Sequence, residues 1–300
     1  MKSPIDIPAS VRQRLLNRSR NDRRPFNELL QYYTMERFLY RLSRSSHADR
    51  FVLKGALMLR VWGSPETRPT MDIDMLGTLN NDEADILARL RDILNVDVQA
   101  DGLVFDSDSL QAERITEDAD YSGIRIRFPG ALGSAKTTMQ LDIGFGDAVY
   151  PEPEESELPT ILDYPAPRLL CYSRESSIAE KLQTMVKLGM LNSRMKDFYD
   201  IWLLSRQFGF DGVKLTKAIR LTFERRGTDL PAAIEAFGKP FIEAKQTQWT
   251  AFRRRLEQEQ VPESFGEIVI AIDQFLSPIL ESIPSGGPPH LSWTAPGPWT

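Results

Sequence analysis

The run Arg68-Pro-Thr-Met-Asp-Ile-Asp-Met-Leu-Gly77 sets two carboxylates, Asp72 and Asp74, two residues apart inside an apolar segment. Side chains on a strand repeat with a period of two, so both carboxylates project from one face of the strand that Met71–Leu76 predicts. Like charges on a mostly buried strand repel each other and are costly to desolvate unless a cation lies between them. Mg²⁺ (or Mn²⁺) fits, because it prefers oxygen ligands together with water and substrate phosphates. The pattern therefore indicates chemistry on a nucleotide.

A third carboxylate lies in a second apolar run, Gln140-Leu-Asp-Ile-Gly-Phe-Gly-Asp147. If this strand pairs beside the first, Asp142 completes a three-carboxylate cluster of the kind that holds two Mg²⁺ ions for in-line attack on phosphorus. The alternative is a structural role, in which Asp142 caps the adjacent glycine-containing loop. Asp147 is interpreted as a loop residue.

Composition is typical of a soluble globular protein, with 41% hydrophobic and 26% charged residues among 300. A single cysteine, Cys171, excludes an internal disulfide and a cysteine-based metal cluster, and favours the reducing cytoplasm. Met1–Pro8 lacks the apolar stretch of a signal peptide, and no run approaches the roughly 18–20 apolar residues of a membrane span. We expect a cytoplasmic protein that makes no membrane contact.

Charge is unevenly distributed around the net value of −5. Residues 1–60 hold thirteen Lys and Arg against five Asp and Glu, whereas residues 81–120 hold three against twelve. The basic segment can bind the phosphates of a nucleic acid, or it can be an ordinary solvated helix face. The interleaved aromatic residues are expected mostly to pack the helix onto the core; they are Phe26, Tyr32, Tyr33, Phe38 and Tyr40.

Hydrophobic periodicity predicts an α+β protein with three parts. The first sixty residues are expected to be mainly helical, and they include Asn27–Leu42 and a short helix at Lys54–Trp62. Further helices are expected at Asp82–Leu94, Ser176–Leu188, Met195–Gln207, Leu215–Arg225 and Ile268–Leu280, and strands at Met71–Leu76, Ile124–Phe128 and Thr138–Ile143. Pro151–Pro167 is expected to be an irregular connection. We predict a mixed-sheet core over residues 1–150, a helical domain over 151–281 and a Gly/Pro-rich tail over 282–300 that either hangs free or docks by its tryptophans.

Two more segments carry charged groups with a possible role. Lys181 stands at the margin of an apolar helix stripe, where a lysine either extends to solvent or contacts nucleotide phosphates as a point charge. Asp197 falls in the first turn of the next helix, and Asp200 follows one turn later. Taken alone, these acids are unremarkable. The only histidines, His47 and His290, lie outside all of these segments, which disfavours histidine-based acid/base catalysis.

Together these segments resemble the AbiEii/AbiGii nucleotidyltransferase toxins, which are the toxin halves of bacterial toxin–antitoxin and abortive-infection pairs and relatives of the MenT toxins. The resemblance rests on five ordered motifs: Phe51-Val-Leu-Lys-Gly-Ala-Leu57, Arg68–Gly77, Gln140–Asp147, Ile178-Ala-Glu-Lys-Leu182 and Asn192-Ser-Arg-Met-Lys-Asp-Phe-Tyr-Asp-Ile201. Segments near Ile7 and Thr222–Pro231 are also similar to the family.

The resemblance implies a DNA-polymerase-β-like nucleotidyltransferase core and assigns roles to particular residues. It implies catalytic roles for Asp72, Asp74, Lys181 and the acid of the last motif, which is Asp197 or Asp200. It implies nucleotide and metal roles for Gly55, Asp72 and Asp74. Further contacts to the nucleotide are expected from Lys54, Arg68, Thr70 and Arg226, and Asp142 is expected to help hold the metal and its nucleotide. Gly55-Ala56 departs from the family, which often has Gly-Gly or Gly-Ser there; one hydroxyl contact is lost, but backbone N–H groups can still bind an anion.

The implied reaction is Mg²⁺-dependent transfer of a nucleoside monophosphate from an NTP to an RNA acceptor, the 3′ end of tRNA, which blocks translation. A cognate antitoxin is the implied protein partner. The sequence leaves two alternatives open: transfer to a protein hydroxyl with the same residues, and a catalytically silent nucleotide-binding module.

Overall fold

The computed structural model describes residues 6–65, 68–118, 121–283 and 290–300. The chain forms two compact units. The first comprises residues 1–146 and 154–171, and the second comprises residues 147–153 and 172–300. The predicted domain boundaries at 150 and 281 remain a prediction.

A mixed eight-stranded sheet forms the centre of the first unit, with the strand order β3-β5-β6-β2-β1-β8-β7 and β4 paired to β5. The strands are β1 (Phe51–Lys54), β2 (Ile73–Gly77), β3 (Leu103–Phe105), β4 (Gln111–Asp118), β5 (Tyr121–Leu132), β6 (Ala135–Phe145), β7 (Glu154–Glu157) and β8 (Arg168–Cys171). The pairs β2–β6 and β1–β8 are parallel, whereas β1–β2, β5–β6 and β7–β8 are antiparallel. The predicted α+β fold with a mixed sheet is confirmed.

The first sixty residues are mainly helical, as expected, but they also contain a strand that was not predicted. Phe51–Lys54 is the central strand β1, and Phe51, Val52 and Leu53 are all buried. A strand that is covered on both faces shows no apolar/polar alternation, so its sequence resembles a buried helix. The short helix expected at Lys54–Trp62 is a 3₁₀ turn, η2 (Gly55–Leu57), followed by α3 (Met58–Val61).

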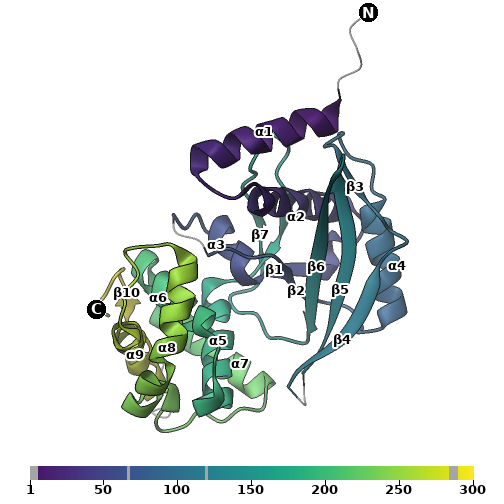
Figure 1. Ribbon diagram of the computed structural model, residues 1–300. Coiled ribbons are helices and arrows are strands. Elements are labelled where there is room, and N and C mark those ends of the chain that lie inside the picture. Colours follow the sequence, from purple (N-terminus) through teal and green to yellow (C-terminus); the bar gives the residue numbers. More distant parts are fainter. Residues whose placement is uncertain (1–5, 66–67, 119–120, 284–289) are drawn as a thin grey trace, which may run out of the picture. The chain divides into compact units, whose positions relative to one another are not determined.

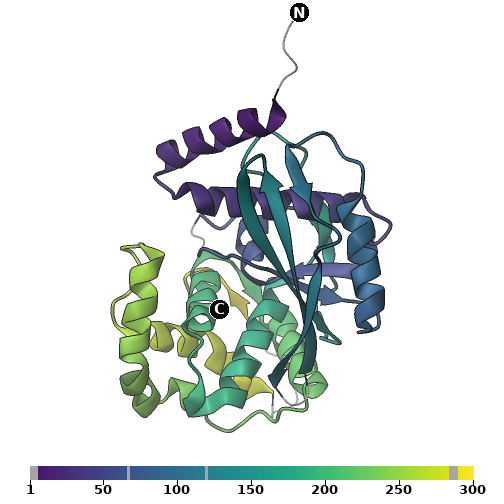
Figure 2. The same cartoon turned by 45° about the vertical axis from the view of Figure 1, so that its right-hand side comes forward.

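The antiparallel hairpin of β5 and β6, teal in Figure 2, contains both strands that were predicted from alternation, Ile124–Phe128 and Thr138–Ile143. Ile124, Ile126 and Phe128 are buried, and the arginines between them are half-buried. Pro151–Pro167 was expected to be irregular, but it contains the edge strand β7. Four residues are too few for a periodic signal.

Helices cover the sheet of the first unit. They are α1 (Ile7–Asp22), α2 (Phe26–Arg44) and α4 (Glu83–Leu94), with a 3₁₀ turn η1 (Ala48–Arg50) before β1. α2 packs against β6 and β8, and α1 and α4 pack against α2 (Figure 1). Phe38 of α2 is fully buried with its ring centroid 5.4 Å from that of Phe128. Tyr32 and Tyr33 are also buried, so the expected packing role of these aromatic residues is confirmed.

The second unit is mainly helical, as expected. Its helices are α5 (Arg174–Leu188), η3 (Gly189–Leu191), α6 (Met195–Gln207), α7 (Gly212–Arg225), η4 (Glu235–Phe237), α8 (Lys239–Leu256) and α9 (Phe265–Ser282). An aromatic cluster joins α6, α8 and α9, in which Phe198 lies 5.6 Å from Phe241 and 5.1 Å from Phe265 between ring centroids. Within the described residues, no helix combines the length and the apolar character that a membrane crossing requires.

The C-terminal tail docks on the second unit by its tryptophans. β10 (Ser292–Trp293) pairs with β9 (Phe210–Asp211). Trp293 is buried and donates from Nε1 to the Ser205 carbonyl at 2.6 Å, and Trp299 stacks on Phe275 with centroids 5.6 Å apart. Of the two expectations for the tail, docking is confirmed for residues 290–300, whereas residues 284–289 lie outside the described part of the chain.

Candidate active site

Three carboxylates meet where β2 and β6 run side by side. Asp74 lies opposite Asp142 in the parallel register, and Asp72 precedes β2. One oxygen from each of Asp72, Asp74 and Asp142 lies within 4.8 Å of the others, and all three residues are half-buried. Asp142 lies inside β6 and is a strand residue, so it is not part of the glycine loop that the alternative interpretation required. The sequence predicts this cluster only if the two strands pair, and the parallel pairing of β2 with β6 meets that condition.

Gly55 lies directly against this cluster. It adopts φ = +75°, and a β-carbon built on it would be 2.0 Å from Oδ2 of Asp74. A side chain at this position would therefore collide with the carboxylate, besides straining the backbone. Lys54, the last residue of β1, lies opposite Asp74 in the antiparallel register.

Asp72 is oriented by its own neighbours. The Thr70 hydroxyl donates to Oδ1 of Asp72 at 2.5 Å, and the Thr70 amide donates to the Tyr32 hydroxyl at 3.1 Å. Gln31 of α2 donates to the Met71 carbonyl at 3.1 Å. Arg68 begins this segment and is buried. The anchors on α2 were not found from the sequence, since they stand about forty residues upstream of the groups they hold.

Arg125 is a site residue that the sequence analysis missed. It lies opposite Asp142 on the neighbouring strand β5, and it donates from Nε to Oδ1 at 2.8 Å and from Nη2 to Oδ2 at 2.7 Å. Gln140 also donates to Oδ2 of Asp142, at 3.3 Å. The strict alternation of Ile124–Phe128 placed Arg125 on the face opposite to the buried side chains, but only the hairpin register reveals its partner.

The second unit holds the other predicted catalytic group, Lys181 of α5. Its Nζ lies 3.1 Å from Oδ1 of Asp197 and 2.8 Å from Oδ2 of Asp200, both on α6. Both aspartates are buried, and the lysine side chain is 17% exposed. Lys181 therefore does not extend to solvent as a simple surface lysine. Asp197 and Asp200 both form ion pairs with it.

Arg226, at the end of α7, belongs to a polar network within the second unit. Its guanidinium lies 2.8 Å from Asp147 and 3.3 Å from Glu180, and it donates to Oε1 of Gln183 at 2.9 Å. Asp147 is a loop residue as predicted, and its side chain is buried. These contacts tie the segment after β6 to α5.

The basic N-terminal segment divides into exposed and buried arginines. Arg37 and Arg41 of α2 are buried, and Arg41 makes a two-fold ion pair with Asp101 at 2.7 and 3.1 Å. Most of the exposed arginines belong to α1 and its C-cap, and two stand further along the chain; they are Arg12, Arg18, Arg20, Arg23, Arg44 and Arg50. The exposed set is the part of the basic segment that can contact phosphates.

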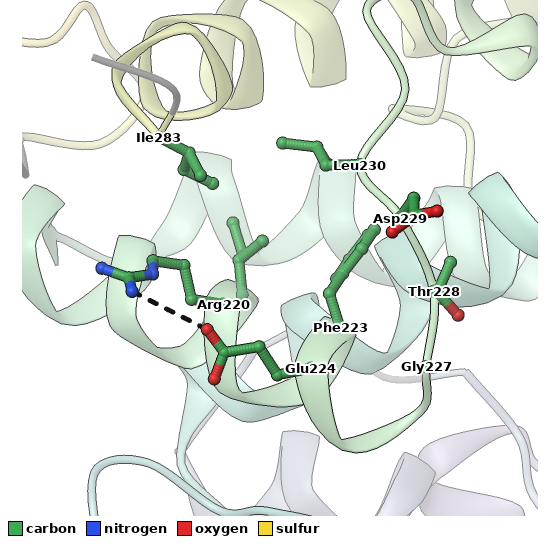
Figure 3. A pocket seen from close by; sticks show the side chains of 9 residues that line it. Arg220, Phe223, Glu224, Gly227, Thr228, Asp229, Leu230 and Ile283 are labelled. Carbon is green, nitrogen blue, oxygen red and sulfur yellow. Dashed lines mark ion pairs between the residues drawn. The ribbon is translucent and has the colours of Figure 1, made fainter. Parts of the chain in front are cut away.

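A pocket of about 380 Å³ lies in the second unit, around the end of α7 (Figure 3). Phe223 and Leu230 form apolar parts of its wall, and the ion pair between Arg220 and Glu224 (3.7 Å) stands on another side. The lining residues belong to the second unit, whereas the three carboxylates belong to the first. The pocket is therefore not formed by the carboxylate cluster.

A mixed sheet that carries three clustered carboxylates on neighbouring strands is typical of nucleotidyltransferases. The comparison with family models agrees, because residues 37–271 match the family described as nucleotidyl transferase AbiEii toxin, type IV TA system. The chain belongs to this family and is a nucleotidyltransferase of the toxin type. Membership of this nucleotidyltransferase toxin family implies an NTP substrate and an antitoxin partner.

Two solved structures are similar to this chain. JHP933 from Helicobacter pylori is 15% identical with a TM-score of 0.50, and the match covers 86% of this chain and 97% of that chain. A candidate nucleotidyltransferase from H. pylori is 14% identical with a TM-score of 0.46, and the match covers 85% of this chain and 96% of that chain. A comparison with curated proteins finds no match.

Proposed function

We propose that the protein is a Mg²⁺- or Mn²⁺-dependent enzyme that transfers a nucleoside monophosphate from an NTP to the 3′ end of tRNA. The parallel register of β2 and β6 carries the proposal, since it gathers Asp72, Asp74 and Asp142 into one oxygen-rich cluster. The acceptor hydroxyl attacks the α-phosphorus, the bond to the β-phosphate breaks, and pyrophosphate leaves. The hydroxyl proton passes to a carboxylate or to water.

The donor set of the cluster suits a hard divalent cation. Three carboxylates supply only oxygen ligands, which match the preference of Mg²⁺, and the half-buried setting favours a counter-charge. Asp72 and Asp74 would hold the ion, with Asp142 as the third carboxylate of the cluster. When bound, the ion stabilises negative charge on the phosphate oxygens.

The remaining residues orient these groups and the substrate. Gly55 leaves room for Asp74. The Gly55 backbone and the side chains of Lys54, Arg68 and Thr70 are proposed to contact the triphosphate. Lys181 is proposed to contact phosphates as a point charge. Its ion pairs with both Asp197 and Asp200 support the view that these acids position the lysine amine.

An RNA acceptor is supported by the exposed arginines of α1. Arg12, Arg18 and Arg20 are exposed and close in sequence on one helix, which allows them to contact a phosphate backbone. Such binding is driven by the release of counterions from the nucleic acid, and added salt makes that release less favourable. Transfer to tRNA is therefore expected to fall steeply with ionic strength. A cytoplasmic location follows from the proposed acceptor.

The acceptor is tested with α-labelled NTPs, offered one at a time with Mg²⁺ and tRNA. We expect label on intact tRNA and none on tRNA whose terminal ribose has been oxidised by periodate, because the 3′ hydroxyls are then lost. Label on protein instead of RNA would replace the proposal by transfer to a protein hydroxyl. Absence of label on any acceptor, with all four NTPs and total RNA and protein present, would favour a silent nucleotide-binding module.

A further inference from the structure

The guanidinium of Arg125 is already paired with Asp142, the third carboxylate of the cluster. It makes two parallel hydrogen bonds to Asp142, at 2.8 and 2.7 Å, which is the strongest geometry available to an arginine and a carboxylate. The side chains are 29% and 16% exposed, respectively, so water screens the pair only in part. Both oxygens of Asp142 are engaged, and Gln140 adds a further hydrogen bond to one of them.

The charge of Arg125 also acts on the rest of the cluster. An arginine side chain stays cationic throughout the physiological pH range, and the negative charges of both Asp142 and Asp72 act on Arg125. The guanidinium therefore remains cationic and lies within electrostatic reach of two of the three carboxylates. A second divalent cation at Asp142 would have to approach this fixed positive charge at a carboxylate whose two oxygens already accept hydrogen bonds from it.

We propose that Arg125 takes the place of a second metal ion at Asp142, so that the nucleotide-free protein binds a single divalent cation, at Asp72 and Asp74. This inference rests on the proposed metal site and specifies its stoichiometry. Arg125 is in this view a positioning residue: it neutralises Asp142, fixes its orientation and keeps it from acting as the ligand of a second ion.

Titration of the nucleotide-free, full-length protein with Mn²⁺, with free Mn²⁺ followed by electron paramagnetic resonance, tests the inference. The wild type is expected to bind one Mn²⁺ per chain. Arg125→Gln is expected to bind a second, and the double variant Arg125→Gln/Asp142→Asn is expected to return to one. Arg127 is the matched control, because it lies on the same strand face two residues away and pairs with Glu113 at 2.9 Å; Arg127→Gln should still bind one.

The inference is overturned if the wild type binds two Mn²⁺, or if folded Arg125→Gln still binds only one. Should Arg125→Gln fail to fold, Arg125→Met serves instead, because it keeps an unbranched side chain but removes the positive charge; a second Mn²⁺ is then expected, and its absence contradicts the inference. A wild type that binds no Mn²⁺ contradicts the proposed metal site itself, a result distinct from a change in stoichiometry.

Discussion

Gly55 shows how one residue serves the site by lacking a side chain. An alanine at this position would have to adopt the left-handed backbone conformation, which costs about 1–2 kcal/mol. Its β-carbon would also collide with the Asp74 carboxylate. We expect Gly55→Ala to lower nucleotidyl transfer by about 100-fold, the scale of loss for a catalytic group displaced by about 1 Å. Steady-state kinetics with the preferred NTP measures this loss.

Gly63 provides the control for Gly55, since it has φ = +71° and no atom within 4 Å of the point where a β-carbon would stand. Gly63→Ala should lose similar stability, measured by urea unfolding, but keep its activity. Equal activity losses in the two variants would show that backbone strain, and not the contact with Asp74, explains the effect.

Glu36 on α2 makes stability depend on pH. Burial raises the pKa of Glu36 to about 7, and its nearest charged partner, Arg37, is 3.9 Å away. The folded protein thus keeps this proton up to about pH 7, whereas the unfolded chain releases it near 4.5. Because the folded state binds more protons in this window, the contribution of Glu36 lowers stability as pH rises from about 4.5 to 7, by about 1–3 kcal/mol.

Glu36→Gln removes this titration while keeping the acceptor for the Ile161 amide, which bonds Glu36 at 2.8 Å. Urea unfolding at pH 5 and pH 8 is therefore expected to show a smaller loss on raising the pH in the variant than in the wild type. Parallel pH profiles for the two proteins would contradict the assignment to Glu36.

Single residues of the site can be predicted from the sequence where the residue type and its spacing along one secondary-structure element point to the same role. Asp72 and Asp74 fall in one cluster, as their two-residue spacing predicts, whereas the contact of Gln31 depends on packing between segments forty residues apart. Arg125 was within reach of a sequence argument. Leu132 and Ala135 close a hairpin over a two-residue loop that contains Gly133, and this register places Arg125 opposite Asp142.

At the scale of elements, helices with a wide apolar stripe were predicted well, and short or weakly patterned elements were not. Met195–Gln207 is confirmed to the residue as α6. α8 was missed because its buried residues, Phe241, Trp249 and Leu256, stand seven or eight residues apart, about one per two turns. β1, β7 and β8 each have four residues and owe their conformation to their neighbours in the sheet.

The C-terminal tail is held by its tryptophans more than by its two-residue strand. Truncation of the buried Trp293 removes its packing on Phe275, at 4.9 Å between centroids, and a hydrogen bond to Ser205. We expect Trp293→Ala to destabilise the protein by about 3–5 kcal/mol in chemical denaturation. Leu191→Ala, at a residue that is 85% exposed, should change stability little; a similar loss in both variants would show that the tail contributes no specific packing.

At the scale of the whole molecule, the proposed site residues are divided between two compact units. The carboxylates, Gly55 and Arg125 belong to the first, and Lys181 with its two aspartates belongs to the second. The family match runs from residue 37 to 271 and spans both units, so the assignment to the nucleotidyltransferase family covers both of them. The sequence indicated both sets of residues, but the anchoring of each set depends on contacts between distant segments.

The carboxylate cluster is proposed to catalyse nucleotidyl transfer. Pyrophosphate release from NTP, in the presence of Mg²⁺ and tRNA, is compared for the wild type, Asp72→Asn and the control Asp108→Asn, whose carboxylate lies on an exposed turn. We predict activity in the wild type and the control and a loss of about 1,000-fold or more in Asp72→Asn, since an electrostatic group of this kind contributes on that scale. Asp72→Asn with undiminished pyrophosphate release would contradict the account.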